Sequence, residues 1–154
     1  MREPVEVADA NVLVALTLAE HVDHEAARAW VAQVVRFAIC PMTESALVRL
    51  LLNPAVTVGA DGRPLTIDQA IDAVKAINAL PNAQLLADTT SLTDARALTR
   101  HIIGHRQVTD TYLLNLAIAH GGVLATFDTK IRASLRPSDR KHVHVISERQ
   151  STRE

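Results

Sequence analysis

Four acidic residues occupy positions where a predicted strand gives way to a predicted helix. Asp9 directly follows a short apolar stretch, and Asp128 comes just after a second one. Glu44 begins the helix predicted after another strand, and Asp110 begins the helix predicted before Asp128. In open parallel sheets, ligand sites form beyond the carboxyl ends of the strands, where the following helices begin. We therefore expect all four acids to lie at one edge of a sheet.

Carboxylates that converge in this way repel one another, and each raises the pKa of its neighbours. A bound cation relieves that repulsion. The histidines are scattered, and the only cysteine is Cys40, so the clustered ligands are hard oxygens, which favour Mg²⁺ or Mn²⁺ over zinc. Such ions lower the pKa of a bound water and stabilise the charge that develops on a phosphate during displacement.

Each acid also has a structural interpretation. Helix dipoles favour carboxylates where Glu44 and Asp110 stand, and Asp9 could cap the helix that follows it. Taken singly, each acid suits a structural role better than a catalytic one, whereas their joint placement on one edge favours a metal site. Asn11 and Thr126 could orient ligands or simply satisfy backbone groups, and the sequence leaves both roles open.

The pattern of apolar residues predicts the elements that must position these acids. Strands are expected at Val5–Ala8, Phe37–Cys40, Gln84–Ala87, Val123–Thr126 and Val143–Ile146. Helices are expected at Asn11–Leu18, His24–Val35, from Glu44 to Asn53, Ile67 to Leu80, Leu92–Ile103, from a Thr109 cap to Gly121, and Lys130–Leu135. This alternation predicts the α/β class, as a three-layer α/β/α sandwich around a mostly parallel sheet. We expect one domain over 1–147 and a polar tail over 148–154.

Composition restricts the classes of function. The chain has 154 residues, 48% of them hydrophobic and 3% aromatic, so its core should be aliphatic. A net charge of -1 gives no general attraction to nucleic acid or to anionic membranes. Acidic residues interrupt the apolar stretch of the first 20 residues, which argues against a signal peptide or a membrane helix. A single cysteine suits a buried thiol in the reducing cytoplasm.

Several basic residues follow Asp128 in the sequence, and their charge indicates which substrate could bind near the acids. They are Lys130, Arg132, Arg136, Arg140 and Lys141. A phosphodiester chain near a metal could meet this positive charge, although a solvated helix end also explains it. The five glycines form neither a phosphate-binding loop nor a dinucleotide fingerprint, so no nucleotide cofactor is expected.

A resemblance to a known family rests on motifs that appear in chain order. They are Asp9-x-Asn11, Thr43-Glu44, Val108-Thr109-Asp110-x-Tyr112-Leu113 and Thr126-Phe127-Asp128, with Arg49, Asn53-Pro54 and the Gly104 to Gln107 approach to Asp110. This set resembles the PIN-domain ribonucleases, specifically the VapC-type toxins of bacterial toxin-antitoxin systems. The resemblance covers nearly the whole chain.

The resemblance implies a magnesium- or manganese-dependent endoribonuclease that cuts structured RNA, such as tRNA or ribosomal RNA, and so inhibits translation. It also implies a cytoplasmic homodimer and a cognate VapB-type antitoxin, which in the family often presents a basic side chain to the acids. Carried over by position, Asp9, Asp110 and Asp128 would be catalytic metal ligands. Glu44 would help to hold the metal or the attacking water.

Two other classes stay open on sequence alone. Haloacid-dehalogenase phosphatases and receiver domains also place an aspartate after a parallel strand with Mg²⁺. The phosphatase motif needs a second aspartate where this chain has Asn11, and receivers need an acidic pair at the first site, so both fit less well. A non-catalytic interaction module would use the surface of the fold alone.

Overall fold

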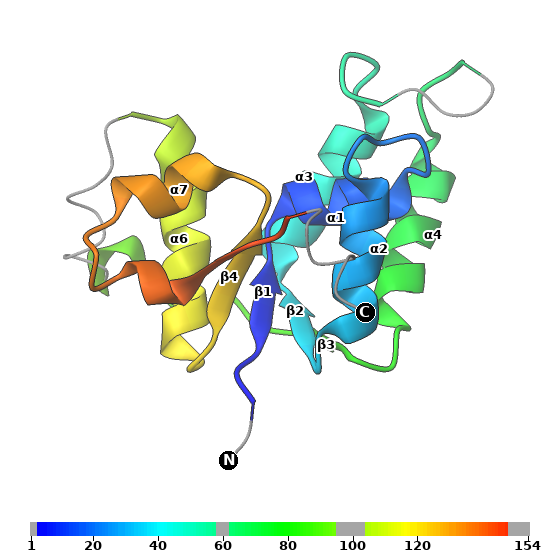
Figure 1. Cartoon of the computed structure of the whole chain (residues 1–154). Coiled ribbons are helices and arrows are strands. Elements are labelled where there is room, and N and C mark those ends of the chain that lie inside the picture. Colours follow the sequence, from blue (N-terminus) through cyan, green and yellow to red (C-terminus); the bar gives the residue numbers. More distant parts are fainter. Residues whose placement is uncertain (1–2, 58–61, 95–103, 148–154) are drawn as a thin grey trace.

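The computed structural model of the chain describes residues 3–57, 62–94 and 104–147 (Figure 1). Within these ranges the strands are β1 Glu6–Ala8, β2 Phe37–Ile39, β3 Ala83–Leu85, β4 Val123–Thr126 and β5 Val143–Val145. They form one sheet in the order β3-β2-β1-β4-β5, and every pairing is parallel. The expected mostly parallel sheet is therefore confirmed, and its described part is parallel throughout.

Helices cover both faces of this sheet, as the α/β/α prediction requires (Figure 1). One layer contains α1 Ala10–Thr17, α2 His24–Gln33, α3 Pro41–Leu52 and α4 Ile67–Asn78, and the other contains α6 Arg106–Ala119 and α7 Thr129–Ser134. Short 3-10 helices η1 Leu92–Asp94 and η2 Arg140–His142 lie in the connections. In the ranges described, no helix combines the length and the apolar character needed to cross a membrane.

The core is aliphatic on both faces, as the composition predicted. On one face, Leu113 and Leu116 of α6 pack in a cluster with Val7 and Leu124 of the central strands. On the other face, helices α1 to α4 pack against the sheet, and the edge-to-face pair Trp30 and Phe37 has ring centroids 5.4 Å apart. Burying one leucine side chain contributes roughly 1.5–3 kcal/mol, so the two layers hold the short strands in place.

The connection from α6 to β4 depends on two glycines. Gly121 has a φ of 68°, a left-handed conformation that ends the helix at low cost for glycine, as predicted. At Gly122, a Cβ atom would lie 2.2 Å from the Val5 carbonyl oxygen. The helix and the next strand can therefore approach β1 closely only because no side chain intervenes.

The starts of two helices were predicted wrongly. Helix α3 begins at Pro41 and not at the predicted Glu44, and the Thr43 hydroxyl inside its first turn accepts a hydrogen bond from the Cys40 N–H at 3.0 Å. Helix α6 begins at Arg106, where the Gln107 side chain accepts a hydrogen bond from the Gly104 N–H at 2.9 Å. Thr109 therefore lies inside the helix and does not cap it.

Other predicted boundaries shift by one or two residues. Strand β3 lies one to two residues before the predicted Gln84–Ala87, β2 and β5 each end one residue early, and α7 begins at Thr129. Of the helix expected at Leu92–Ile103, the structure describes η1, and residues 95–103 lie outside the described ranges. Residues 58–61 and the expected tail, 148–154, also lie outside them.

A polar contact links strands β1 and β5 to helix α2. The Trp30 indole donates a hydrogen bond to Glu6 Oε1 at 3.1 Å, and His144 Nδ1 contacts the same oxygen. This hydrogen bond to Glu6 raises the pKa of His144, against the opposing effect of burial. The protonated His144 side chain is therefore stabilised by the folded structure.

We predict that this contact makes stability depend on pH. Because folding raises the pKa of His144, its contribution is complete below the ordinary histidine value of about 6.5 and is lost as pH rises through the raised pKa. His144→Asn should lower the Tm more at about pH 5.5 than at about pH 9. The difference should be on the order of 2–4 °C, since a partly exposed pair contributes about 1 kcal/mol or less.

The matched control is His142→Asn, because the His142 side chain makes no hydrogen bond or ion pair with a described residue. Its effect on the Tm should be the same at both pH values. Equal losses for His144→Asn at the two pH values would show that the contact with Glu6 does not stabilise the fold.

Candidate active site

The candidate site lies where the direction of the chain through the sheet reverses. Strand β1 leads by crossover helices to β2 on one side, whereas β4 leads to β5 on the other, and β1 and β4 are parallel neighbours. A crevice forms at such a switch point, outside the carboxyl ends of the two strands. Asp9 directly follows β1 and Asp128 closely follows β4, so both acids lie at this switch point.

Thr126 connects these two acids through one hydroxyl. Its Oγ1 atom donates a hydrogen bond to Asp9 Oδ2 at 3.0 Å and accepts one from the Asp128 N–H at 3.1 Å. Thr126 is fully buried and Asp9 is 5% exposed, so the contact is shielded from water. The role that the sequence left open for Thr126 is therefore to orient Asp9 and the backbone that carries Asp128.

Asp128 also starts the next helix. It is the N-cap of α7, and its Oδ1 atom accepts a hydrogen bond from the Lys130 N–H at 2.8 Å. The side chain is half-buried. Asp9 occupies the N-cap position of α1, but its side chain makes no capping hydrogen bond. Asp9 therefore has the position expected of a cap, while its carboxylate accepts the hydrogen bond from Thr126.

Asp110 joins this group from helix α6. It lies in the second turn of the helix rather than at its start, because α6 begins at Arg106. Burial, and then the negative charges of Asp9 and Asp128, raise the pKa of Asp110 to about 7. Burial also raises the pKa of Asp9, an effect that the hydrogen bond from Thr126 opposes and the charge of Asp128 reinforces. Three acids therefore interact electrostatically, as expected from the sequence.

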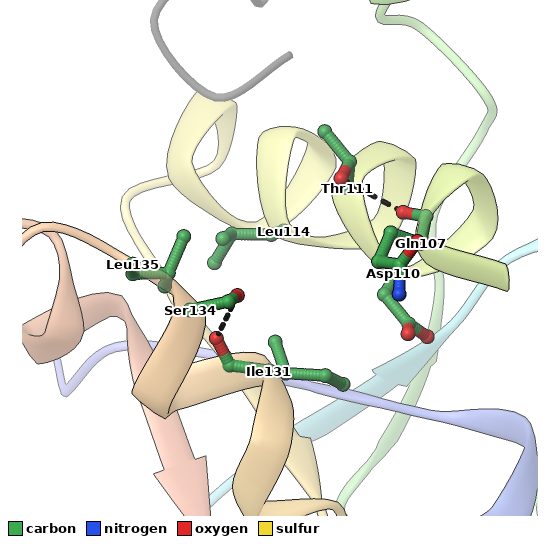
Figure 2. A pocket seen from close by; sticks show the side chains of 7 residues that line it. All are labelled: Gln107, Asp110, Thr111, Leu114, Ile131, Ser134 and Leu135. Carbon is green, nitrogen blue, oxygen red and sulfur yellow. Dashed lines mark hydrogen bonds between the residues drawn. The ribbon is translucent and has the colours of Figure 1, made fainter. Parts of the chain in front are cut away.

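Figure 2 shows the surroundings of Asp110 between α6 and α7. A cavity of about 20 Å³ is lined there by Gln107, Asp110, Thr111, Leu114, Ile131, Ser134 and Leu135. Leu114, Ile131 and Leu135 are the apolar part of this lining. Such a volume holds about one water molecule. The Asp110 carboxylate extends from α6 on the side where Ile131 lies, so its solvation is restricted by both helices (Figure 2).

Glu44 lies at the same edge of the sheet but stands apart from the other three. It is half-buried in the first turn of α3, the helix that follows β2. The charges that raise the pKa of Asp110 are those of Asp9 and Asp128, and Glu44 is not among them. Asn11 is exposed, and its side chain makes no hydrogen bond with a described residue. The structure thus brings three predicted acids together and leaves Glu44 at the margin.

The carboxylate oxygens of Asp9, Asp110 and Asp128 are the type of ligand that a hard divalent cation prefers. Their arrangement in the structure is a separate question. In the part of the chain that the structure describes, no group of three or more His, Cys, Asp or Glu side chains is arranged to hold a metal ion. The pKa of Asp110 is raised first by burial and then by the charges of Asp9 and Asp128, and a cation would relieve this repulsion. Asp9, Asp110 and Asp128 therefore fit a cation by their chemistry, and binding would have to draw their carboxylates closer.

Sequence reasoning missed one acid at this edge. Asp88 follows β3, and its Oδ1 atom accepts a hydrogen bond from the Tyr112 hydroxyl of α6 at 2.7 Å. Its charge also contributes to the raised pKa of the buried Cys40 thiol, for which burial is the main cause. The same rule that identified Asp9 and Asp128, an acid just past a strand, would have found Asp88.

Cys40 itself is buried and free, as predicted. Its thiol lies 3.5 Å from the Thr43 hydroxyl, at the junction of β2 and α3. Because burial raises the pKa of the thiol, the reactive thiolate is disfavoured. The interpretation of Cys40 as a structural residue is consistent with this environment.

Comparison with known proteins identifies similar chains. The PIN domain family model matches residues 7–134. Ribonuclease VapC29 of Mycobacterium tuberculosis is 41% identical over 122 residues, which cover 79% of this chain and 84% of that protein. Ribonuclease VapC44 of the same organism is 36% identical over 136 residues, which cover 86% of this chain and 92% of that protein.

A solved structure has the same fold. It is Mycobacterium tuberculosis VapC20, described as a sarcin-ricin loop cleaving toxin, and the two structures superpose with a TM-score of 0.60. The match covers 85% of this chain and 98% of that one, at 18% sequence identity. At this identity the similarity establishes the arrangement of helices and strands.

We predict that Asp110→Asn stabilises the metal-free protein at high pH. Because folding raises the pKa of Asp110, its ionised form costs stability, and this cost grows as pH rises from about 4 towards about 7. In EDTA, the variant should have a higher Tm than the wild type at about pH 8 and a similar one at about pH 4. The gain should be a few °C, since a partly exposed group contributes on the order of 1 kcal/mol.

The control for this comparison is Asp72→Asn, which removes an exposed carboxylate from α4, outside the acidic group. It should leave the difference between the two pH values unchanged. A lower Tm for Asp110→Asn at about pH 8 would contradict the assignment of electrostatic repulsion to these acids.

Proposed function

The chain belongs to the PIN-domain family as a VapC-type ribonuclease, and from this premise we propose that it is a toxin that cuts structured RNA with Mg²⁺ or Mn²⁺. The RNA would be a tRNA or a ribosomal RNA, and its cleavage would inhibit translation. The observation that carries the proposal is the group of three acids at the switch point, in which the pKa of Asp110 rises to about 7. Such a group is costly for the fold and is explained by a function that uses a cation.

Each acid has a proposed role in this reaction. Asp9, Asp110 and Asp128 would hold the cation, and Glu44 would hold the metal or the attacking water from the margin of the site. When bound, the ion would supply a water of lowered pKa and neutralise charge developing on the scissile phosphate. Asp110 would lose its proton as the site is loaded, because its pKa lies near neutrality.

Thr126 would act through Asp9 as a positioning residue. Its hydroxyl bonds both Asp9 Oδ2 and the Asp128 N–H, so it fixes the orientation of one acid relative to the other. Groups that orient metal ligands typically contribute about 10–100-fold to metal affinity or activity. The buried location of Thr126 means that no water can readily replace the hydroxyl.

We predict that inducing the wild-type chain in bacteria arrests growth and creates new RNA 5′ ends, whereas Asp9→Ala does neither. Thr126→Val, which keeps the shape but removes the hydroxyl, should lower cleavage about 10–100-fold, and Thr126→Ser should retain most of it. The measurement is a map of 5′ ends in total RNA, followed by cleavage of the mapped RNA with purified protein. EDTA should abolish that cleavage and Mg²⁺ should restore it.

Three results would each contradict a part of this proposal. If soluble wild-type protein, expressed without an antitoxin, produces no new ends, the chain is not an active ribonuclease under these conditions and the proposal is wrong. If Asp9→Ala produces the same ends as wild type, the acidic group is not the site of cleavage. Activity that persists in EDTA would refute the dependence on a divalent ion.

The same proposal includes a cognate VapB-type antitoxin. None of the four predicted acids forms an ion pair with a described residue, so a basic side chain of a partner can neutralise them. On the other helical layer, α1, α2 and α4 border a hollow of about 610 Å³. Its apolar lining includes Leu16, Val31, Ala73 and Leu80, which suits an apolar segment of the antitoxin.

A charge placed in this hollow is predicted to weaken antitoxin binding. Ala76 is exposed and lines the hollow, so Ala76→Glu should reduce affinity at least about tenfold, because a carboxylate buried against apolar atoms is costly. Ala32→Glu adds the same charge on α2 outside the hollow and is the control. Binding can be measured by calorimetry, and RNA cleavage by both variants should match the wild type.

Light scattering of the free chain tests both the proposed homodimer and the assignment of the hollow to the antitoxin. A homodimer stays a prediction, and a monomeric mass at working concentration would refute it. If Ala76→Glu changes that mass, the hollow belongs to the dimer interface and its assignment to the antitoxin is wrong. The proposed cytoplasmic location is tested by fractionation of cells that express the chain.

A further inference from the structure

A second hollow lies next to the acidic site, on the side of strand β5. It has a volume of about 410 Å³ and is lined by Thr129, Arg132, Ala133, Arg140 and Val145. We propose that Arg132 and Arg140 form a subsite in this hollow that binds a backbone phosphate of the RNA, distinct from the phosphate that is cleaved. The inference rests on the proposed ribonuclease function and specifies how the substrate is held.

The residues that line the hollow are neighbours of the residues that form the acidic site. Thr129 directly follows Asp128 in the chain and is the first residue of α7. Val145 of β5 is the register partner of Thr126, whose hydroxyl bonds Asp9. The ends of strands β4 and β5 therefore carry both features, which places the hollow within reach of an extended polyanion bound at Asp128.

Arg140 is held in place before any ligand arrives. Its Nε atom donates to the Leu135 carbonyl at 3.2 Å, and Nη2 donates to the Ala133 carbonyl at 3.5 Å. A guanidinium has five N–H donors, so these contacts leave three without a partner among the described residues. A guanidinium fixed in this way loses little conformational entropy when it binds an anion.

Arg132 provides the second charge. It is exposed on α7, and its side chain makes no hydrogen bond or ion pair with a described residue. The Thr129 hydroxyl is also exposed and has no partner among those residues, so it can donate to the same anion. Two guanidinium groups and one hydroxyl around a single hollow provide the hydrogen-bond donors that recognise a phosphate group.

Local charge favours a polyanion at this surface. Residues 129–142 contain five basic residues and one acidic residue, although the net charge of the chain is -1. No acid in the described ranges neutralises Arg132 or Arg140 through an ion pair. A nucleic acid gains affinity from such positions by releasing its counterions.

The subsite predicts a measurable change in salt dependence. Labelled tRNA is titrated with the full chain in EDTA, which prevents cleavage, at several salt concentrations. Arg132→Gln should weaken binding about three- to tenfold and reduce the slope of log K against log salt by about 1. Arg140→Gln should do the same, whereas Arg140→Lys, which keeps the charge but loses the fork, should retain the slope and bind more weakly.

Arg136→Gln is the matched control, because Arg136 belongs to the same basic segment and does not line the hollow. Its slope should stay close to that of the wild type. Equal changes for Arg132→Gln and Arg136→Gln would show that only diffuse positive charge attracts RNA, which overturns the subsite. Thermal melting checks that each variant folds. If the Arg140 variants have a lowered Tm, the comparison of Arg132→Gln with Arg136→Gln decides the test alone.

The outcomes separate this inference from the proposed function. If the wild type cleaves RNA and the Arg132 variant binds it with an unchanged slope, the subsite is wrong and the ribonuclease function stands. If the wild type neither binds nor cleaves RNA, both proposals fail. If tRNA binding is unchanged but antitoxin binding weakens, the hollow recognises an acidic protein segment, and the phosphate subsite is refuted.

Discussion

The parallel pairing of β1 with β4 is the constraint on which the candidate site depends. It places Asp9 beside Thr126, 117 positions later in the chain, so that one buried hydroxyl can connect Asp9 with the backbone of Asp128. No local feature of the sequence could hold these groups together. The pairing is possible because Gly122 lets the chain approach the Val5 carbonyl closely as β4 begins.

The acidic group has an electrostatic cost that the rest of the fold must offset. Asp9 and Asp110 are both partly or fully withdrawn from water, and like charges nearby raise the pKa of each. The strands that carry the site are only three or four residues long, so their own hydrogen bonds contribute little. Leucine and valine side chains buried on both faces of the sheet therefore supply the stability that keeps repelling carboxylates at one edge.

The acidic, basic and apolar surfaces of the molecule lie on different elements of the fold. The acids lie at the carboxyl ends of the central strands, and the hollow with Arg132 and Arg140 lies beyond them along α7 and β5. The apolar hollow is on the layer formed by α1, α2 and α4. Negative, positive and apolar surfaces are thus contributed by different elements, and a substrate and a protein partner can be recognised by different parts of the chain.

Much of the fold and the site followed from sequence, because short apolar strands, capping residues and acids just past strand ends are local patterns. They predicted the α/β sandwich, most element positions, and the convergence of Asp9, Asp110 and Asp128. Local patterns misled at the starts of two helices, since α3 begins at Pro41 before the predicted Glu44, and α6 begins at Arg106 before the predicted Thr109 cap.

Tertiary structure alone decided the strand order, the link that Thr126 makes and the pairing of Asp88 with Tyr112. Those features depend on contacts between residues distant in sequence, which no periodicity encodes.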